Sequence, residues 1–278
     1  MHTSGESGFA TTRDGRRLHY MSRGTGDTTV VFESGMGFGR STWGLVQPAV
    51  SAIARTVVYD RAGLGRSDDD STPRSLERTA ADLGDLLDHL GGERFVLIGH
   101  SWGGPIVRVA AAARTDVAGL VLVDPSDEHS DLYFDPSSAK RFELSARLLP
   151  GLARTGLYRL AGRSYGRNQP VDVLADFRAE DFTVRAATTA AAETRGVLAG
   201  LRSLRDTPPA LGDLPVTVIS GTRIGFGEGK VRPSIVAAHR ATAAGLPNGR
   251  HVEAPGSAHL VMWDDPAIVT AETVRMVG

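Results

Sequence analysis

The pentapeptide Gly99-His100-Ser101-Trp102-Gly103 decides the fold of this 278-residue chain. It matches the pattern Gly-x-Ser-x-Gly and lies between a short apolar run at residues 95–98 and a helix-compatible run at 105–113. A sharp turn from a strand into a helix leaves no room for neighbouring side chains, so glycines flank the serine and its hydroxyl is held exposed near a helix N-terminus. This context predicts that Ser101 is a nucleophile rather than a simple helix cap.

Short apolar runs on both sides of this turn predict a parallel sheet. They occupy residues 28–32, 56–59, 95–98, 120–123 and 216–219. None alternates between apolar and polar residues, as a strand with one wet face does, so we expect helices to cover both faces. The intervening apolar stripes at helical spacing, as in residues 76–90, indicate βαβ units. Asp14-Gly15 between two extended segments predicts an antiparallel hairpin at the start of the fold.

The alternation of strands and helices stops between about residues 126 and 209, where helical patterns follow one another. We interpret residues 126–209 as a helical cap inserted into an α/β core made of residues 1–125 and 210–278. Most of its apolar and aromatic side chains are expected to pack inside the protein, and a few to line a substrate pocket. Its arginines are nearly balanced by acidic residues, so the composition of the cap does not indicate an anionic substrate.

The composition excludes several classes of function. The chain has 31 basic and 32 acidic side chains and a formal charge of -1, so neither nucleic acid nor an anionic membrane is an expected partner. It has no cysteine, which excludes disulfides, thiolate nucleophiles and cysteine-bound metal sites. The N-terminal residues lack a basic segment followed by an apolar run, and no later stretch is long and apolar enough to span a bilayer, so the expected location is cytoplasmic.

Together with the serine turn, three further segments resemble the α/β-hydrolase family, specifically its small capped esterase-like branch. Residues 59–68, Tyr-Asp-Arg-Ala-Gly-Leu-Gly-Arg-Ser-Asp, are similar to a structural loop of that family. Residues 33–37, Glu-Ser-Gly-Met-Gly, are similar to the loop that donates a backbone N–H to the oxyanion hole, although Ser34 stands where the family often has histidine. The resemblance therefore implies that the N–H groups of Met36 and Trp102 stabilise the oxyanion.

The third segment, residues 254–259, is similar to the late Gly-x-x-His loop of the family. The resemblance places the catalytic base at His259, after Ser101 in the chain. The other histidines lack this context, and His100 is expected only to shape the turn around Ser101.

The acid of a Ser-His-acid triad is the point at which the chain departs from the family. The usual position, after the run 216–219, holds Ile224 instead of a carboxylate. Asp124 follows the run 120–123, a strand end at which some α/β-hydrolases carry their acid, and it is the leading candidate. Glu228 and Asp127 remain alternatives, as does a dyad without an acid, and an aspartate before Pro125 also suits a purely structural turn.

The pattern predicts a serine hydrolase that cleaves an ester, lactone or thioester of a small, largely apolar molecule through an acyl-enzyme. No cofactor is required, and the sequence shows no cluster of histidine and carboxylate ligands that would indicate a metal.

The same residues would also serve a carbon-carbon bond hydrolase or a cofactor-free perhydrolase. Epoxide hydrolase and haloalkane dehalogenase chemistry is disfavoured, because those relatives attack through an aspartate where this chain has Ser101. A non-catalytic ligand-binding protein is the alternative from another class. Oligomeric state is not predicted.

Overall fold

The apolar runs form the middle of one eight-stranded sheet in the computed structural model, which describes residues 1–225 and 229–278. The strands are β1 (Glu6–Thr11), β2 (Arg17–Arg23), β3 (Thr28–Glu33), β4 (Arg55–Tyr59), β5 (Arg94–His100), β6 (Val117–Val123), β7 (Val216–Gly221) and β8 (Gly249–Ala254). Their order in the sheet is β1-β2-β4-β3-β5-β6-β7-β8. The pairs from β4 to β8 are parallel, whereas β1 pairs antiparallel with β2, and β2 with β4. The predicted α/β fold with a mostly parallel sheet is confirmed.

The predicted hairpin is formed by β1 and β2, whose turn contains Gly15 at a φ of 86°. The strand β8 was not among the apolar runs. Its sequence, Gly-Arg-His-Val-Glu-Ala, is polar at several positions because β8 lies at the edge of the sheet and most of its residues stay partly accessible. An edge strand carries a weaker hydrophobic signal than a central one.

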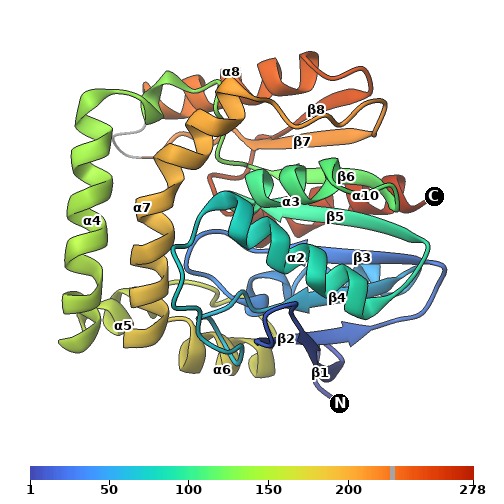
Figure 1. The fold of residues 1–278 in the computed structure, drawn as a ribbon, viewed down its shortest axis with the longest axis horizontal. Coiled ribbons are helices and arrows are strands. Elements are labelled where there is room, and N and C mark those ends of the chain that lie inside the picture. The colour runs from blue at the N-terminus through green and yellow to red at the C-terminus, as the bar shows by residue number, and fades with distance from the viewer. Residues whose placement is uncertain (226–228) are drawn as a thin grey trace.

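Helices cover both faces of the sheet (Figure 1). They are α1 (Gln47–Val50), α2 (Leu76–Leu90), α3 (Gly103–Ala112), α4 (Pro136–Arg154), α5 (Leu157–Gly162), α6 (Val171–Glu180), α7 (Val184–Asp206), α8 (Val231–Ala244), α9 (Val261–Asp264) and α10 (Pro266–Val277), with the short 3-10 helices η1 (Arg40–Trp43) and η2 (Asp131–Tyr133). Val31 and Leu97 pack with α2 and α3, whereas Phe32 and Ile98 pack with α1 and α10. Successive strand residues point to opposite faces, so the central strands must be apolar at every position.

The chain between β6 and β7 runs through η2 and the four helices α4 to α7. The helix α4 packs along α7, and both stand at the left of Figure 1, beyond the ends of the sheet strands. The helices α5 and α6 connect them near the bottom of that view. The division into a core and a cap with boundaries at residues 126 and 209 stays a prediction. Within residues 1–225 and 229–278, no helix has the length and apolar character needed to cross a membrane.

Candidate active site

Ser101 occupies a strained turn between β5 and α3. Its φ is 52°, in the left-handed region that a residue with a side chain rarely adopts. The flanking glycines are required by close packing: a Cβ on Gly99 would fall 2.5 Å from the carbonyl oxygen of Gly103, and a Cβ on Gly103 would fall 2.6 Å from that of Glu33. The N–H of Ser101 donates to the carbonyl of Val123 at 3.1 Å, which ties the turn to the end of β6. The turn therefore presents the hydroxyl at the end of the sheet where β5 and β6 both finish.

His259 lies in the loop between β8 and α9, and its ring joins the serine to an aspartate. Its Nε2 lies 3.1 Å from Ser101 Oγ, and its Nδ1 lies 2.6 Å from Asp124 Oδ2. The side chain of His259 is 47% exposed, whereas that of Asp124 is 1% exposed. The three candidate residues from separate parts of the sequence are thus brought together in one chain of hydrogen bonds, open to solvent at the histidine.

Asp124 is held in place by two groups from the far end of the chain. Its carboxylate accepts hydrogen bonds from the backbone N–H of Gly221 at 3.0 Å and from Arg232 Nη1 at 2.7 and 2.8 Å. Burial would raise the pKa of Asp124, but the interaction with His259, chiefly through the hydrogen bond, and the nearby positive charge of Arg232 outweigh it and lower the pKa to about 2. The carboxylate is therefore ionised at neutral pH. Arg232 was not singled out in the sequence, because no local pattern shows that α8 brings it to β6.

The other candidate acids differ from Asp124 in their surroundings. The Asp127 carboxylate accepts hydrogen bonds from His129 and from Thr242 Oγ1, and no bond joins it to His259. Glu228 lies outside the described residues. Ile224, at the usual position of the acid, is 56% exposed. Among the carboxylates that the structure describes, that of Asp124 is the one within hydrogen-bonding reach of His259.

His100 makes a contact that its position in the turn did not predict. Its Nε2 lies 3.1 Å from the carbonyl oxygen of His259, and the two rings are 4.7 Å apart. Burial is the main cause that lowers the pKa of His100 to about 3, with a smaller effect of His259. The neutral ring must donate from Nε2, because a carbonyl oxygen only accepts. His100 therefore fixes the backbone of the residue that faces Ser101.

The loop after β3 carries Met36, whose backbone N–H is the first of the two predicted oxyanion donors. Within residues 1–225 and 229–278, neither this N–H nor that of Trp102, at the start of α3, donates a hydrogen bond to the protein. Side chains anchor both residues. Met36 Sδ lies 2.9 Å from Thr194 Oγ1, and the indole of Trp102 is completely buried. Two backbone donors without a protein partner thus lie close to Ser101, since a Cβ on Gly35, the residue before Met36, would fall 3.2 Å from Ser101 Cβ.

A buried ion pair holds the Met36 loop in shape. Arg61 donates to the carbonyl oxygens of Ser34 at 2.7 Å and Gly35 at 2.8 Å. Glu193, from α7, accepts from Arg61 Nε at 2.8 Å and from the backbone N–H of Gly37 at 3.0 Å. Burial would raise the pKa of Glu193, but Arg61, Arg74 and the Gly37 N–H lower it to about 2. The carboxylate is therefore ionised, and its hydrogen bond holds Gly37, the residue after Met36, in place.

Residues 59–68 are expected to be structural, and the contacts of Arg61 agree with this expectation. Glu193, which follows Gly37 by 156 positions, is not recognisable as a site residue from the sequence. An acidic residue within a run of alanines and threonines on a long helix resembles a solvated side chain, and only the packing of α7 against the site shows otherwise.

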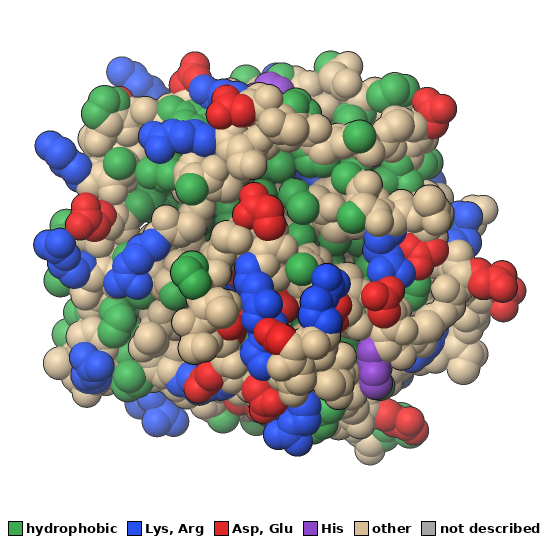
Figure 2. Space-filling view, in the orientation of Figure 1, with side chains coloured by type: hydrophobic (Ala, Val, Ile, Leu, Met, Phe, Trp, Pro, Cys, Tyr) green, Lys and Arg blue, Asp and Glu red, His purple; other side chains and the backbone are tan. Residues whose placement is uncertain are grey.

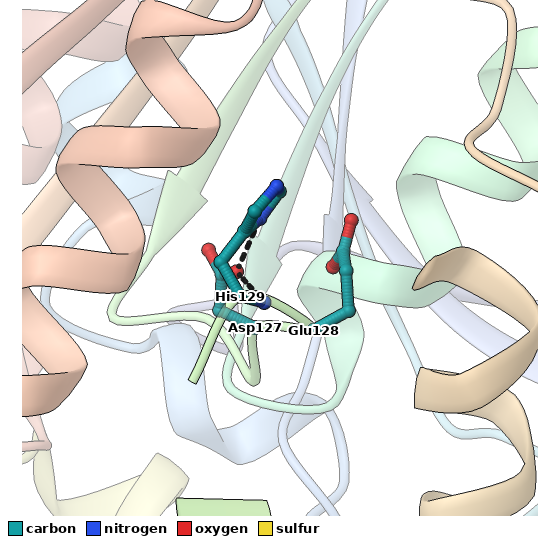
Figure 3. A group of neighbouring side chains, drawn as sticks. All are labelled: Asp127, Glu128 and His129. Atoms are coloured by element: carbon teal, nitrogen blue, oxygen red, sulfur yellow. Dashed lines mark hydrogen bonds and ion pairs between the residues drawn. The ribbon is translucent and has the colours of Figure 1, made fainter. Parts of the chain in front are cut away.

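Three consecutive residues after β6 form a cluster of metal-type ligands that the sequence analysis did not expect. One ligand atom each of Asp127, Glu128 and His129 lies within 4.8 Å of the others. In Figure 3, hydrogen bonds join Asp127 to His129, and the Glu128 carboxylate lies apart from that pair. Both Glu128 oxygens accept hydrogen bonds from Arg108, at 2.7 and 2.8 Å. Protein donors therefore compensate the charge of both carboxylates.

A mostly parallel sheet with a serine turn after β5 and a histidine loop after β8 defines the α/β-hydrolase class of fold and site. Residues 30–272 match the model of the alpha/beta hydrolase family, and the chain belongs to that family.

Known members show how the chain relates to hydrolases of different activity. It is 26% identical over 281 residues to haloalkane dehalogenase 2 of Mycobacterium tuberculosis, an alignment that covers 94% of this chain and 92% of the dehalogenase. An esterase of Thermogutta terrifontis superposes with a TM-score of 0.75 and 23% identity, covering 98% of both chains. The enol-lactonase of Burkholderia xenovorans superposes with a TM-score of 0.74 and 24% identity, covering 97% of this chain and 99% of the lactonase. These similarities establish the fold. Because the relatives differ in activity, the reaction has to be inferred from the residues of the site.

Proposed function

We propose that this hydrolase is a serine hydrolase that cleaves an ester, lactone or thioester of a small, largely apolar substrate. The observation that carries the proposal is the continuous hydrogen-bonded chain from Ser101 Oγ through His259 to the buried carboxylate of Asp124. A hydroxyl in this setting is suited to attack a carbonyl carbon. The serine at this position also argues against haloalkane dehalogenase chemistry, which in the family uses an aspartate there.

The proposed reaction begins when His259 Nε2 takes the proton of the Ser101 hydroxyl. The oxygen attacks the substrate carbonyl, and the ionised Asp124 stabilises the imidazolium through Nδ1. The N–H groups of Met36 and Trp102 stabilise the negative oxygen of the tetrahedral intermediate. The imidazolium then returns its proton to the leaving alcohol or thiol, which leaves an acyl group on Ser101.

Water completes the cycle in the proposed mechanism. His259 removes a proton from a water molecule, the hydroxide attacks the acyl carbon, and a second tetrahedral intermediate collapses to release the acid and restore the serine hydroxyl. The half-exposed ring of His259 is consistent with access of water to this step. All proton transfers use side chains of this protein.

Labelling with a fluorophosphonate tests the proposal and separates it from a non-catalytic ligand-binding protein. A fluorophosphonate reacts covalently with an activated serine hydroxyl, so we expect one adduct per chain in the native protein. The adduct should be absent in Ser101→Ala and present in Ser126→Ala, a matched control whose backbone N–H bonds to the carbonyl of Ser101. A folded native protein that remains unlabelled would contradict the proposed function.

A further inference from the structure

Four arginines that the proposed reaction does not use gather around one cavity at α5 and α6. The cavity has a volume of about 710 Å³ and is lined by Arg159, Gly162, Arg163, Arg167, Arg178 and Phe182. We propose that this arginine cavity is a binding site for a phosphorylated ligand. In Figure 2, basic side chains predominate along the left edge of the molecule, where Figure 1 places α4 and α5.

The four guanidinium groups have no acidic partner. Among the described residues, none of Arg159, Arg163, Arg167 and Arg178 has a carboxylate oxygen within 4.0 Å of its nitrogens. The structure, over residues 1–225 and 229–278, gives these four side chains one hydrogen bond, from Arg167 Nε to the backbone carbonyl of Arg163 at 3.3 Å. Guanidinium groups stay charged at all ordinary pH values. All four side chains are exposed to solvent, and their positive charge is not neutralised by an ion pair with any residue that the structure describes.

The acidic residues that balance the composition of this segment point elsewhere. On α6, Asp176 and Glu180 are one turn apart and pair with Arg66, at 3.1 and 2.8 Å. Both also pair with the buried Arg40. Arg178 lies between them in the sequence and so points to the opposite side of the helix, toward the cavity. The segment is thus nearly neutral in composition, but on α6 the acidic side chains lie on one side and Arg178 lies on the other.

The chemistry of the cavity favours phosphate groups. A guanidinium donates two parallel hydrogen bonds to a phosphate, which adds geometric selectivity to the attraction of charge. Several guanidiniums in one cavity repel one another, and a multiply charged anion relieves that repulsion. The buried ring of Phe182 closes the cavity on its apolar side: a Cβ on Gly162 would fall 2.4 Å from the ring. A compound with two or more phosphate charges matches this arrangement.

The arginine cavity adjoins the candidate active site. Arg167 lines both this cavity and a second pocket of about 470 Å³ that is also lined by His259 and Trp263. A phosphorylated ligand would therefore lie beside the pocket to which the histidine is exposed. The proposed binding depends on the arginines alone and does not require Ser101 to be a nucleophile.

Calorimetric titration of the full chain with pyrophosphate tests the site, at low ionic strength and again at 0.15 M salt. We expect saturable binding that Arg163→Gln with Arg178→Gln weakens by at least about tenfold, because each substitution removes charged hydrogen bonds to the anion. The matched control is Arg94→Gln with Arg202→Gln, which removes the same charge from two exposed arginines outside the cavity, one at the start of β5 and one on α7. The control should change the dissociation constant by less than about twofold, since distant surface charges are screened.

Two results would overturn the proposal. One is the absence of saturable pyrophosphate binding to the native chain, and the other is an equal loss of affinity in the two double variants, which would indicate diffuse attraction only. Thermal unfolding of each variant checks that the helices remain folded. Ser101→Ala should bind pyrophosphate like the native chain, so the result for the cavity is independent of the result for the proposed reaction.

Discussion

The described part of the chain contains two hydrogen-bonded chains of the type Ser-His-Asp, which share their connectivity and differ in backbone conformation and solvent access. In the first, His259 joins Ser101 to Asp124 at 3.1 and 2.6 Å. In the second, His19 lies 2.7 Å from Ser7 Oγ through Nε2 and 3.0 Å from Asp60 Oδ2 through Nδ1. Both chains therefore have distances typical of hydrogen bonds, and these distances alone do not distinguish them.

The surroundings separate the two chains. Ser7 lies in the regular edge strand β1, whereas Ser101 has a φ of 52° at the start of a helix. The ring of His19 is completely buried, whereas that of His259 is half-exposed. Asp60 also accepts from Arg40 at 2.6 Å, so its charge is used to hold the core together. Under the proposed function, Ser101 is distinguished from Ser7 by its strained turn, by the nearby backbone donors and by the accessible ring of His259. A line of hydrogen bonds is not enough.

Removing each serine should produce the largest contrast. Ser101→Ala is expected to lower kcat for a short-chain aryl ester by at least about 10⁴-fold, since no other group supplies the nucleophile. Ser7→Ala should leave kcat within about twofold. Steady-state kinetics on the two purified variants checks this. Equal rates in the native protein and Ser101→Ala would remove the distinction between the two chains.

Neutralising each aspartate should produce the next largest contrast. Asp124→Asn is expected to reduce kcat by about 10³- to 10⁴-fold, because an amide in place of the carboxylate no longer stabilises the charged His259 ring. Asp60→Asn should keep nearly native kcat per folded molecule but destabilise the protein by about 3 kcal/mol, because it leaves Arg40 underpaired in the interior. Kinetics and urea unfolding on both variants give the comparison. A strong loss of kcat in folded Asp60→Asn would contradict it.

Replacing Glu193, which holds the Met36 loop, should have an intermediate effect on kcat. Glu193→Gln weakens the hold on Arg61 and Gly37, so the Met36 N–H loses its orientation, and we expect kcat to fall by about 10- to 100-fold with little change in KM. The control is Glu272→Gln, another buried carboxylate, whose partners Arg250 and Arg275 belong to β8 and α10. A change in stability alone, with native kcat, would show that Glu193 has no part in positioning the loop.

The smallest expected effect is the contribution of Asp60 to the pH dependence of the free energy of unfolding. Burial would raise the pKa of Asp60 above its ordinary value of 3.8, but His19 and Arg40 lower it to about 2. A lowered pKa in the folded state contributes stability that is complete above about pH 4 and is lost as the pH falls toward 2. The contribution is about 2 kcal/mol. The free energy of unfolding should therefore fall less steeply between pH 4 and pH 3 in Asp60→Asn than in the native protein, and equal slopes would contradict this assignment.

Much of the fold and half of the site follow from local sequence. The serine turn and the central strands are recognisable because local constraints determine their residue types, such as the missing Cβ at Gly99 and Gly103. The histidine loop was predicted from its resemblance to the Gly-x-x-His loop of the family. The edge strand β8 was not identified directly, since its partly exposed residues carry little hydrophobic signal.

The remaining site residues depend on tertiary packing. Glu193 and Arg232 reach the site from α7 and α8, and their sequence neighbours do not distinguish them from surface charges. Asp124 could be proposed only from its place at a strand end. The separation of charge on α6 was likewise invisible in the composition, because the same counts of arginine and acid fit a mixed surface and a divided one.

A covalent acyl group on Ser101 would be direct evidence that this serine is the nucleophile. The native protein should be mixed with a short-chain aryl ester, quenched in acid within milliseconds to seconds, digested and examined by mass spectrometry. We expect one peptide that contains Ser101 and is heavier by the mass of the acyl group. This peptide should be absent in Ser101→Ala and unchanged in Ser7→Ala. Turnover of the ester with the acyl group on another residue, or activity retained in Ser101→Ala, would contradict this role of Ser101.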